Sequence, residues 1–178
     1  MHRTLAELQT KLHQSVDGLD ATETQAHPPG RWSIQQIVQH LTLTYDATAS
    51  VLRERLSKGR PTQTRPKFVQ HCIRWTVVEL GYFPRGRKAP DMVKPPADAI
   101  ALPGHQLVTE ATRRLETMDD LVDETVRLFG AKRRSVSHII LGPLTPAQWR
   151  RFHLVHGLHH LRQIDAIRRQ HPSIRPGR

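Results

Sequence analysis

Four histidines stand within eight residues of the segment HLVHGLHH, which runs from His153 to His160. Imidazole nitrogens bind zinc, nickel, iron or copper ions, so such a cluster suggests a metal site. His156 and His160 are four residues apart, and on a helix they lie one turn above the other, where both rings can reach one ion. Two ligands from one helix make half of a site. A third ligand must come from another element.

His40 is the best candidate for that third ligand. It lies about two turns inside a helix whose start is marked by the segment WSIQQI, where Ser33 can cap the backbone and Gln36 can reach back to it. Three neutral imidazoles leave at least one coordination position open, as in catalytic zinc sites. Water could bind there with a lowered pKa, or a substrate thiol or carboxylate could replace it. The sequence therefore predicts a divalent metal, zinc or nickel, bound by His40, His156 and His160.

Alternatives to this interpretation remain open. The chain has 12 histidines, so a pair with helical spacing also arises by chance. We interpret His153 and His159 as packed or surface residues, although His153 could replace a ligand or act as a base beside the metal. Cys72, the only cysteine, lies in an apolar stretch and is predicted to be packed and unreactive. No Gly-x-Ser-x-Gly motif or phosphate-binding glycine motif is present, and no Asp or Glu has a spacing that nominates it as the general base.

Apolar periodicity and capping signals predict four long helices, over residues 5–19, 33–58, 104–130 and 145–170. A long connection separates the second from the third, with an extra helix expected around Phe68 to Leu80 and an irregular remainder rich in Pro and Gly. No stretch alternates as a strand would. The fold class expected from the sequence is an all-α four-helix bundle with a long crossover.

Length and composition predict one domain over residues 1–178, with a basic irregular tail from about residue 171. No signal peptide or membrane-spanning stretch is apparent, so we expect a soluble, cytoplasmic protein. The formal charge is +11, from 27 Lys and Arg against 16 Asp and Glu. This charge supports a second hypothesis, a non-catalytic basic module that binds nucleic acid or another acidic partner. Because the basic residues are spread along the chain, a solvated surface explains them better.

Two segments, GRWSIQQIVQHL and HIILGPLTPAQWRRFHLVHGLHHLRQI, resemble the DinB-like superfamily of bacterial proteins, which are regarded as metalloenzymes. In that superfamily a Trp-Ser helix start precedes one His, and a His-x-x-His-His-x-x-Gln helix closes the domain. The match is specific over residues 30–45 and 138–167, and the intervening crossover contributes little.

The resemblance implies an up-down-down-up bundle and a divalent metal held at the positions of His40, His156 and His160. His159 and Gln163 match the motif as orienting or packing groups and not as ligands. The superfamily includes proteins similar to thiol-dependent S-transferases and others described as hydrolases, so the resemblance implies a small-molecule substrate, such as a low-molecular-weight thiol. A homodimer is compatible with it, and DNA binding is not implied. A degenerate member that only dimerises is a third hypothesis, against which the intact ligand positions argue.

Overall fold

The computed structural model describes residues 1–84 and 88–171, and it is mostly helical. Four helices are long: α1 (Arg3–Val16), α2 (Ile34–Ser57), α4 (Gly104–Phe129) and α5 (Pro146–Gln170). The other helical elements are short: η1 (Glu23–Gln25), α3 (Phe68–Arg74), the π-helix η2 (Trp75–Glu79) and η3 (Asp91–Val93). Two strands, β1 (Val136–His138) and β2 (Gly142–Leu144), form an antiparallel pair.

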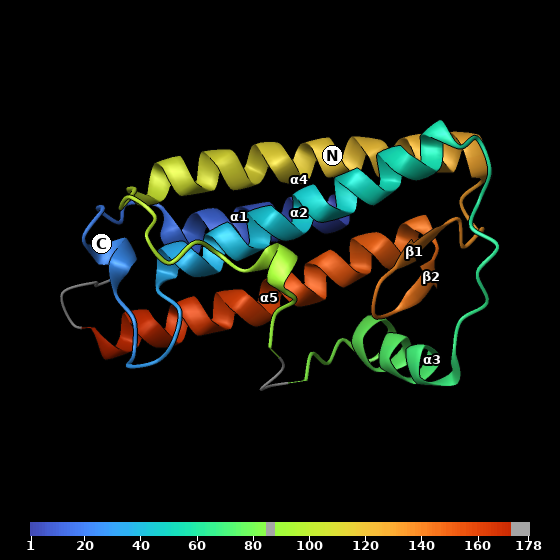
Figure 1. Ribbon diagram of the computed structural model, residues 1–178. Coiled ribbons are helices and arrows are strands. Elements are labelled where there is room, and N and C mark those ends of the chain that lie inside the picture. Colours follow the sequence, from blue (N-terminus) through green and yellow to red (C-terminus); the bar gives the residue numbers. More distant parts are fainter. Residues whose placement is uncertain (85–87, 172–178) are drawn as a thin grey trace.

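The four long helices lie side by side (Figure 1), with α1 and α2 each in contact with α4 and α5. Along the chain, α2 and α4 run in one direction, and α1 and α5 run in the other (Figure 1). The connection from α2 to α4 passes through α3 and η2 and then returns across α2, which η3 contacts. This connection therefore covers the side of the molecule on which α2 and α5 meet.

Capping boxes fix the starts of the two helices that carry the histidines. Ser33 Oγ accepts a hydrogen bond from Gln36 N at 3.2 Å, and Gln36 Oε1 accepts one from Ser33 N at 3.0 Å. Thr145 and Gln148 make the same pair of bonds before α5, each 3.2 Å long. Each bond satisfies a backbone N–H that the helix leaves unpaired. The starts of α2 and α5 agree with the sequence prediction.

Apolar stripes fill the interior between the long helices. Leu5, Leu8, Leu12 and Val16 of α1 are fully buried, as their spacing predicted. Gly157 of α5 allows α1 to approach closely, because a Cβ atom at this glycine would lie 2.4 Å from Leu8 Cδ1. The α1–α5 contact therefore depends on a residue without a side chain.

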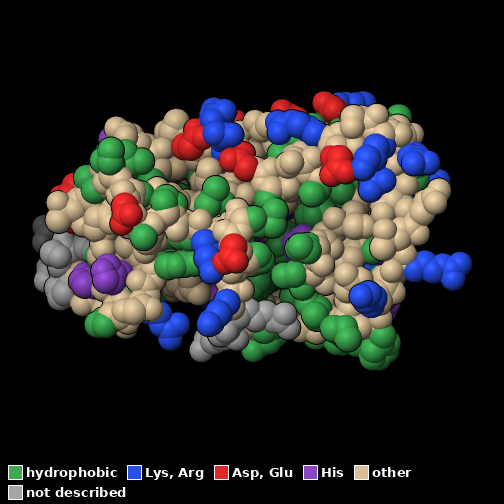
Figure 2. Space-filling view, in the orientation of Figure 1, with side chains coloured by type: hydrophobic (Ala, Val, Ile, Leu, Met, Phe, Trp, Pro, Cys, Tyr) green, Lys and Arg blue, Asp and Glu red, His purple; other side chains and the backbone are tan. Residues whose placement is uncertain are grey.

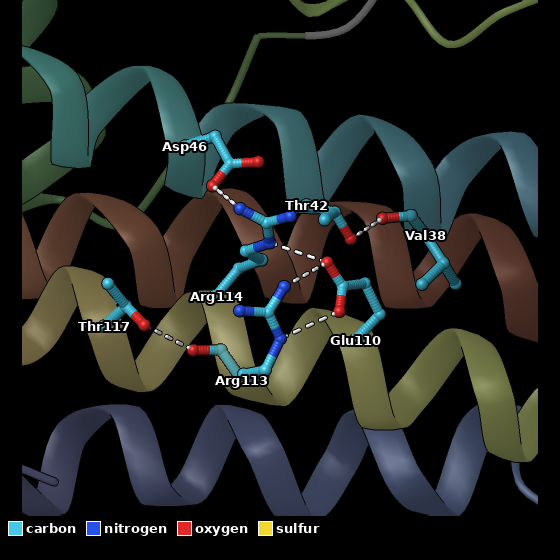
Figure 3. A network of polar contacts seen from close by, with 7 residues as sticks. All are labelled: Val38, Thr42, Asp46, Glu110, Arg113, Arg114 and Thr117. Carbon is cyan, nitrogen blue, oxygen red and sulfur yellow. Dashed lines mark hydrogen bonds and ion pairs between the residues drawn. The ribbon is translucent and has the colours of Figure 1, made fainter.

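A polar network joins α2 to α4 at the surface (Figure 3). Arg114 of α4 donates to Asp46 of α2 over 3.1 Å and to Glu110 of its own helix over 2.6 Å. Arg113 also binds Glu110, at 2.7 Å. These side chains are partly exposed, so the network contributes little to stability.

The connections differ from the sequence prediction in two places. The β1–β2 hairpin was not expected, because each strand has only three residues and no alternating pattern. His138 closes its turn, since its Nδ1 atom accepts from the N–H groups of Ile140 and Leu141. The extra helix forms as predicted, but its second half is the π-helix Trp75–Glu79.

The prediction that Cys72 is packed is wrong, because this residue is exposed. The extra helix buries Arg74, Val77 and Val78, whereas Phe68 and Trp75 remain exposed. The apolar stretch around Cys72 therefore has an outward-facing side. The basic tail predicted from about residue 171 lies, apart from His171, outside the described residues. Within the described residues, no helix is long and apolar enough to cross a membrane.

Candidate metal centre

Three histidine side chains meet in the interior between α2 and α5. The Nε2 atom of His156 lies 3.3 Å from Nε2 of His40 and 3.1 Å from Nε2 of His160. One ring nitrogen from each residue lies within 4.8 Å of the others. All three residues are buried, with 4 to 6% of their surface exposed. The structure thus brings together the three predicted residues, the three-histidine cluster, and they could hold a metal ion.

Hydrogen bonds from Nδ1 orient two of the three rings. His40 donates to the carbonyl oxygen of Val93 over 2.7 Å, and His160 donates to Gln163 Oε1 over 3.0 Å. The amide of Gln163 in turn donates to His159 Nε2 over 3.2 Å. These partners assign the proton to Nδ1 of His40 and His160, which leaves a lone pair on each Nε2 atom. Both lone pairs belong to the nitrogens that face His156.

Burial keeps the three imidazoles neutral. It lowers the pKa of His40 below its usual value of 6.5, although the bond to Val93 acts in the opposite direction. Burial lowers the pKa of His160 to about 3, and the nearby His40 contributes to the shift. The pKa of His156 is well below 6.5 because of burial and then because of His160 and His40. Neutral imidazole is the form that binds metal ions.

The donor set fits a tetrahedral divalent ion. Nitrogens about 2.0–2.1 Å from a tetrahedral zinc ion are about 3.3–3.4 Å apart. The separations from His156 to His40 and to His160, 3.3 and 3.1 Å, are close to this value, and all three nitrogens lie within 4.8 Å of one another. Lone pairs on nitrogens this close repel one another unless a cation or a proton lies between them. One proton on His156 Nε2 can bridge toward His40 or toward His160, but a central cation attracts all three nitrogens.

The third ring lacks the support that the other two have. Nδ1 of His156 is buried and has no hydrogen-bond partner among the described residues. Phe152 stacks on this ring instead, with centroids 5.5 Å apart and an angle of 6° between the planes. Trp32 packs on His40 and Phe83 packs on His156, each with centroids 5.0 Å apart. Aromatic rings thus enclose the cluster and keep it in a weakly polar environment.

The cluster borders a cavity of about 1340 Å³ between α2, α5 and the connection that covers them. All three histidines of the cluster line it. This volume exceeds that of most pockets for small ligands. A molecule in the cavity could therefore reach the nitrogen atoms directly.

The other two histidines of the HLVHGLHH segment lie outside the cluster. His153 is completely buried, and its Nε2 atom bonds with Thr48 Oγ1 over 3.1 Å. Burial lowers the pKa of His153 to about 3. His159 lines the cavity and contacts Gln163 and Phe83. His153 is therefore a packed residue beside the cluster, and His159 is in contact with the group that orients His160.

Sequence reasoning missed two parts of the site. The Val93 carbonyl and the Phe83 ring both come from the long connection, where neither periodicity nor a motif indicates which residues turn inward. The ring of Trp32, which lies just before the start of α2, also contacts His40 and His160, a role that the sequence analysis did not assign to it.

These features define a class, namely mostly helical proteins with a buried three-histidine cluster that could hold a metal ion and that borders a large cavity. A family model described as a protein of unknown function (DUF1569) matches residues 2–166, and the chain belongs to this family. Comparisons with curated proteins and with solved structures gave no match.

Proposed function

We propose that the protein is a metal-dependent enzyme in which His40, His156 and His160 bind one divalent ion, zinc or nickel, and leave a coordination position open to the cavity. The observation that carries the proposal is the convergence of three buried Nε2 atoms from two helices. A metal ion held there would supply a Lewis acid that lowers the pKa of a bound thiol or water. The reaction class we propose is therefore transfer to a small thiol or hydrolysis.

The protein's own residues prepare the site for that chemistry. Val93 and Gln163 fix the tautomers of His40 and His160, so that both rings present a lone pair without rearrangement. The aromatic rings of Trp32, Phe83 and Phe152 restrict water around the histidines. No carboxylate lines the cavity among the described residues, so we assign no general base.

We also propose that α1, α2, α4 and α5 form a DinB-like bundle with the up-down-down-up connection. The support is the lengthwise contact of the four helices, the direction of each in Figure 1, and the two motifs that include the histidines. On this interpretation, the segment between α2 and α4 is the long crossover. The same proposal includes a single domain over the chain and a cytoplasmic location. It also includes a small-molecule substrate and is compatible with a homodimer.

The alternative, a basic module that binds nucleic acid, has less support. Lys and Arg side chains are spread over the face shown in Figure 2, several of them close to Asp or Glu, and do not merge into one patch. Arg113, Arg114 and Arg150 are each paired with a carboxylate. Nucleic-acid binding through phosphate contacts would weaken steeply with salt. We expect no retention on a polyanion column at moderate salt.

Metal analysis tests the proposed function. The protein is purified without a histidine tag and without added metal, and its metal content is measured by plasma mass spectrometry before and after incubation with zinc or nickel. We expect about one equivalent per chain. The triple variant His40→Ala, His156→Ala, His160→Ala should contain none, whereas His105→Ala, at an exposed histidine of α4, should retain it. Absence of metal from the unmodified chain, even after incubation, would overturn the proposal.

A further inference from the structure

The cavity beside the three-histidine cluster has an uneven charge distribution. Among the described residues that line it, none is Asp or Glu, whereas Arg31, Lys88 and Lys94 are cationic. Lys94 is paired with Asp91, but Arg31 and Lys88 have no carboxylate partner among the described residues. The chain has 16 Asp and Glu residues, and none of them is among the described residues that line this cavity. Such a surface attracts anions and excludes cations.

Two of the cationic residues are sequence neighbours of groups that contact His40. Arg31 directly precedes Trp32, whose ring packs on His40. Lys94 directly follows Val93, whose carbonyl oxygen accepts from the same ring. Lys88 belongs to the covering connection and lines the same cavity. An anionic group beside the cluster would therefore share the cavity with three cationic residues and, among the described lining residues, with no carboxylate.

The cavity extends from the cluster in two directions, toward the end of α5 at Gln170 and, on the other side, as an arm with a largely apolar wall. Along α2 its lining runs from His40 through Thr44, Ala47 and Thr48 to Val51. Since a helix rises 1.5 Å per residue, Val51 lies about 16 Å from His40 along the helix axis. Ile73 and Val77 of the extra helix line the arm, as do Ile140 and Leu141 of the hairpin turn and Phe152 of α5. This length suits an extended alkyl or aryl chain.

Polar groups in the arm are uncharged. Among the described residues that line it, His138 is the only titratable one, and burial lowers the pKa of this ring to about 4, so it is neutral at physiological pH. Gln70, Thr64 and Ser137 are the other polar groups near the hairpin. A charged tail in this arm would lose hydration without gaining a partner.

We propose that the substrate of this site is an amphipathic organic anion, which places its anionic group beside the cluster, near Arg31 and Lys88, and its apolar chain in the arm between α2, the extra helix and the hairpin. This inference deepens the proposed function, because it names the substrate class of the same site. It does not depend on the metal, since the arm and the cationic residues belong to the protein itself. The two proposals can therefore fail separately.

The test is calorimetric titration of the metal-free chain with probes that share a tail or a head. Decanoate carries both parts, decyltrimethylammonium has the same tail with a cationic head, and acetate has the head alone. We expect decanoate to bind more tightly than either. Affinity should also rise steadily from hexanoate through octanoate to decanoate, because each added methylene buries more apolar surface. This series needs no altered protein.

Variants then test where the anionic head and the apolar tail of bound decanoate lie. Arg31→Gln with Lys88→Gln should weaken decanoate roughly three- to tenfold, because each exposed charge contributes modestly. The matched variant Arg53→Gln with Lys132→Gln, at exposed positions outside the cavity lining, should change affinity little. Ala47→Phe should fill the arm and weaken decanoate at least about tenfold while leaving acetate unaffected.

Two results would overturn the inference. One is decanoate binding no tighter than decyltrimethylammonium, and the other is affinity independent of chain length. Either result would leave a positive metal analysis intact. Conversely, selective decanoate binding by a chain that takes up no metal would support the substrate class and remove the metal-dependent function.

Discussion

The Nε2 atoms of His40 and His156 lie 3.3 Å apart, although 116 residues separate the two histidines. His40 belongs to α2 and His156 to α5, so the cluster exists only when these helices are packed in the correct register. Capping boxes fix the start of each helix, and Val93 and Gln163 fix two of the three rings. The arrangement of the cluster therefore depends on residues that are not themselves proposed metal ligands. Substitution of several of them tests this dependence.

Gln163 should control metal affinity without being a ligand. Gln163→Leu removes the acceptor that holds His160 Nδ1–H, so the ring loses its fixed tautomer and orientation. We expect metal affinity to fall about 10- to 100-fold, measured by competition with a chromophoric chelator. Gln170→Leu is the control, because Gln170 lines the same cavity and makes no hydrogen bond to the cluster. Unchanged affinity in Gln163→Leu would show that this hydrogen bond does not orient the ring.

Acid should destabilise the protein through its buried neutral histidines. Burial lowers the pKa of His138 to about 4 and that of His153 to about 3, whereas an unfolded histidine titrates near 6.5. Below about pH 6.5 the unfolded chain therefore binds protons that the folded chain does not, and the free energy of unfolding decreases as the pH falls toward these values. At about pH 5.5 each such histidine should cost about 1 kcal/mol relative to about pH 7.5.

The variant His138→Asn isolates one of these groups. An Asn oxygen can accept from the backbone of Ile140 and Leu141 as His138 Nδ1 does, but it does not titrate. Urea unfolding of the metal-free chain, followed by circular dichroism at both pH values, should show an acid-induced loss smaller by about 1 kcal/mol. The exposed substitution His105→Asn should leave the loss as it is. Equal losses in all three proteins would contradict the assigned protonation state of His138.

A buried ion pair should be important for stability. Asp119 is fully buried and accepts from Arg150 Nε over 2.6 Å and from the backbone N–H of His2 over 2.6 Å. Asp119→Ala leaves Arg150 buried without this partner and should lower the free energy of unfolding by about 3–5 kcal/mol. Asp123→Ala removes the half-exposed second carboxylate and should cost about 1 kcal/mol or less. The losses are measured by urea unfolding. Similar losses in both variants would contradict the expectation that the buried carboxylate contributes more to stability than the half-exposed one.

Gly157 should resist enlargement because of Leu8. The Gly157→Ala methyl group would lie 2.4 Å from Leu8 Cδ1, so the buried leucine must move. We expect a loss of about 1–3 kcal/mol, against the usual gain of about 1 kcal/mol for Gly→Ala within a helix. In the double variant with Leu8→Val, the loss in free energy of unfolding should be smaller than the sum of the losses in the two single variants. Strict additivity in thermal and urea unfolding would mean that the helices separate at this point.

The helices and the histidines could be predicted from the sequence because both signals are local. Ser33 and Thr145 mark helix starts by their own side chains, and the spacing of His156 and His160 places them on one face. His40 follows a clear helix start, and the structure places it on α2 beside His156 and His160, while its role as a metal ligand stays a prediction.

The connection between α2 and α4 could not be predicted in the same way. Val93 reaches His40 through a backbone carbonyl, which any residue type provides, so no sequence pattern identifies it. Apolar composition does not predict burial around Cys72, because the extra helix has Phe68, Cys72 and Trp75 exposed. The turn of the hairpin is held by His138 Nδ1, which accepts a hydrogen bond from the N–H group of Ile140. Strands of three residues give no sequence pattern that predicts this contact.

The most direct test of the metal-site account is anomalous diffraction from crystals of the chain loaded with one equivalent of zinc or nickel, with data collected above and below the absorption edge of the metal. We expect one strong anomalous peak about 2.0–2.1 Å from Nε2 of His40, of His156 and of His160. A peak elsewhere, or three ring nitrogens in their present arrangement with no peak between them, would contradict it.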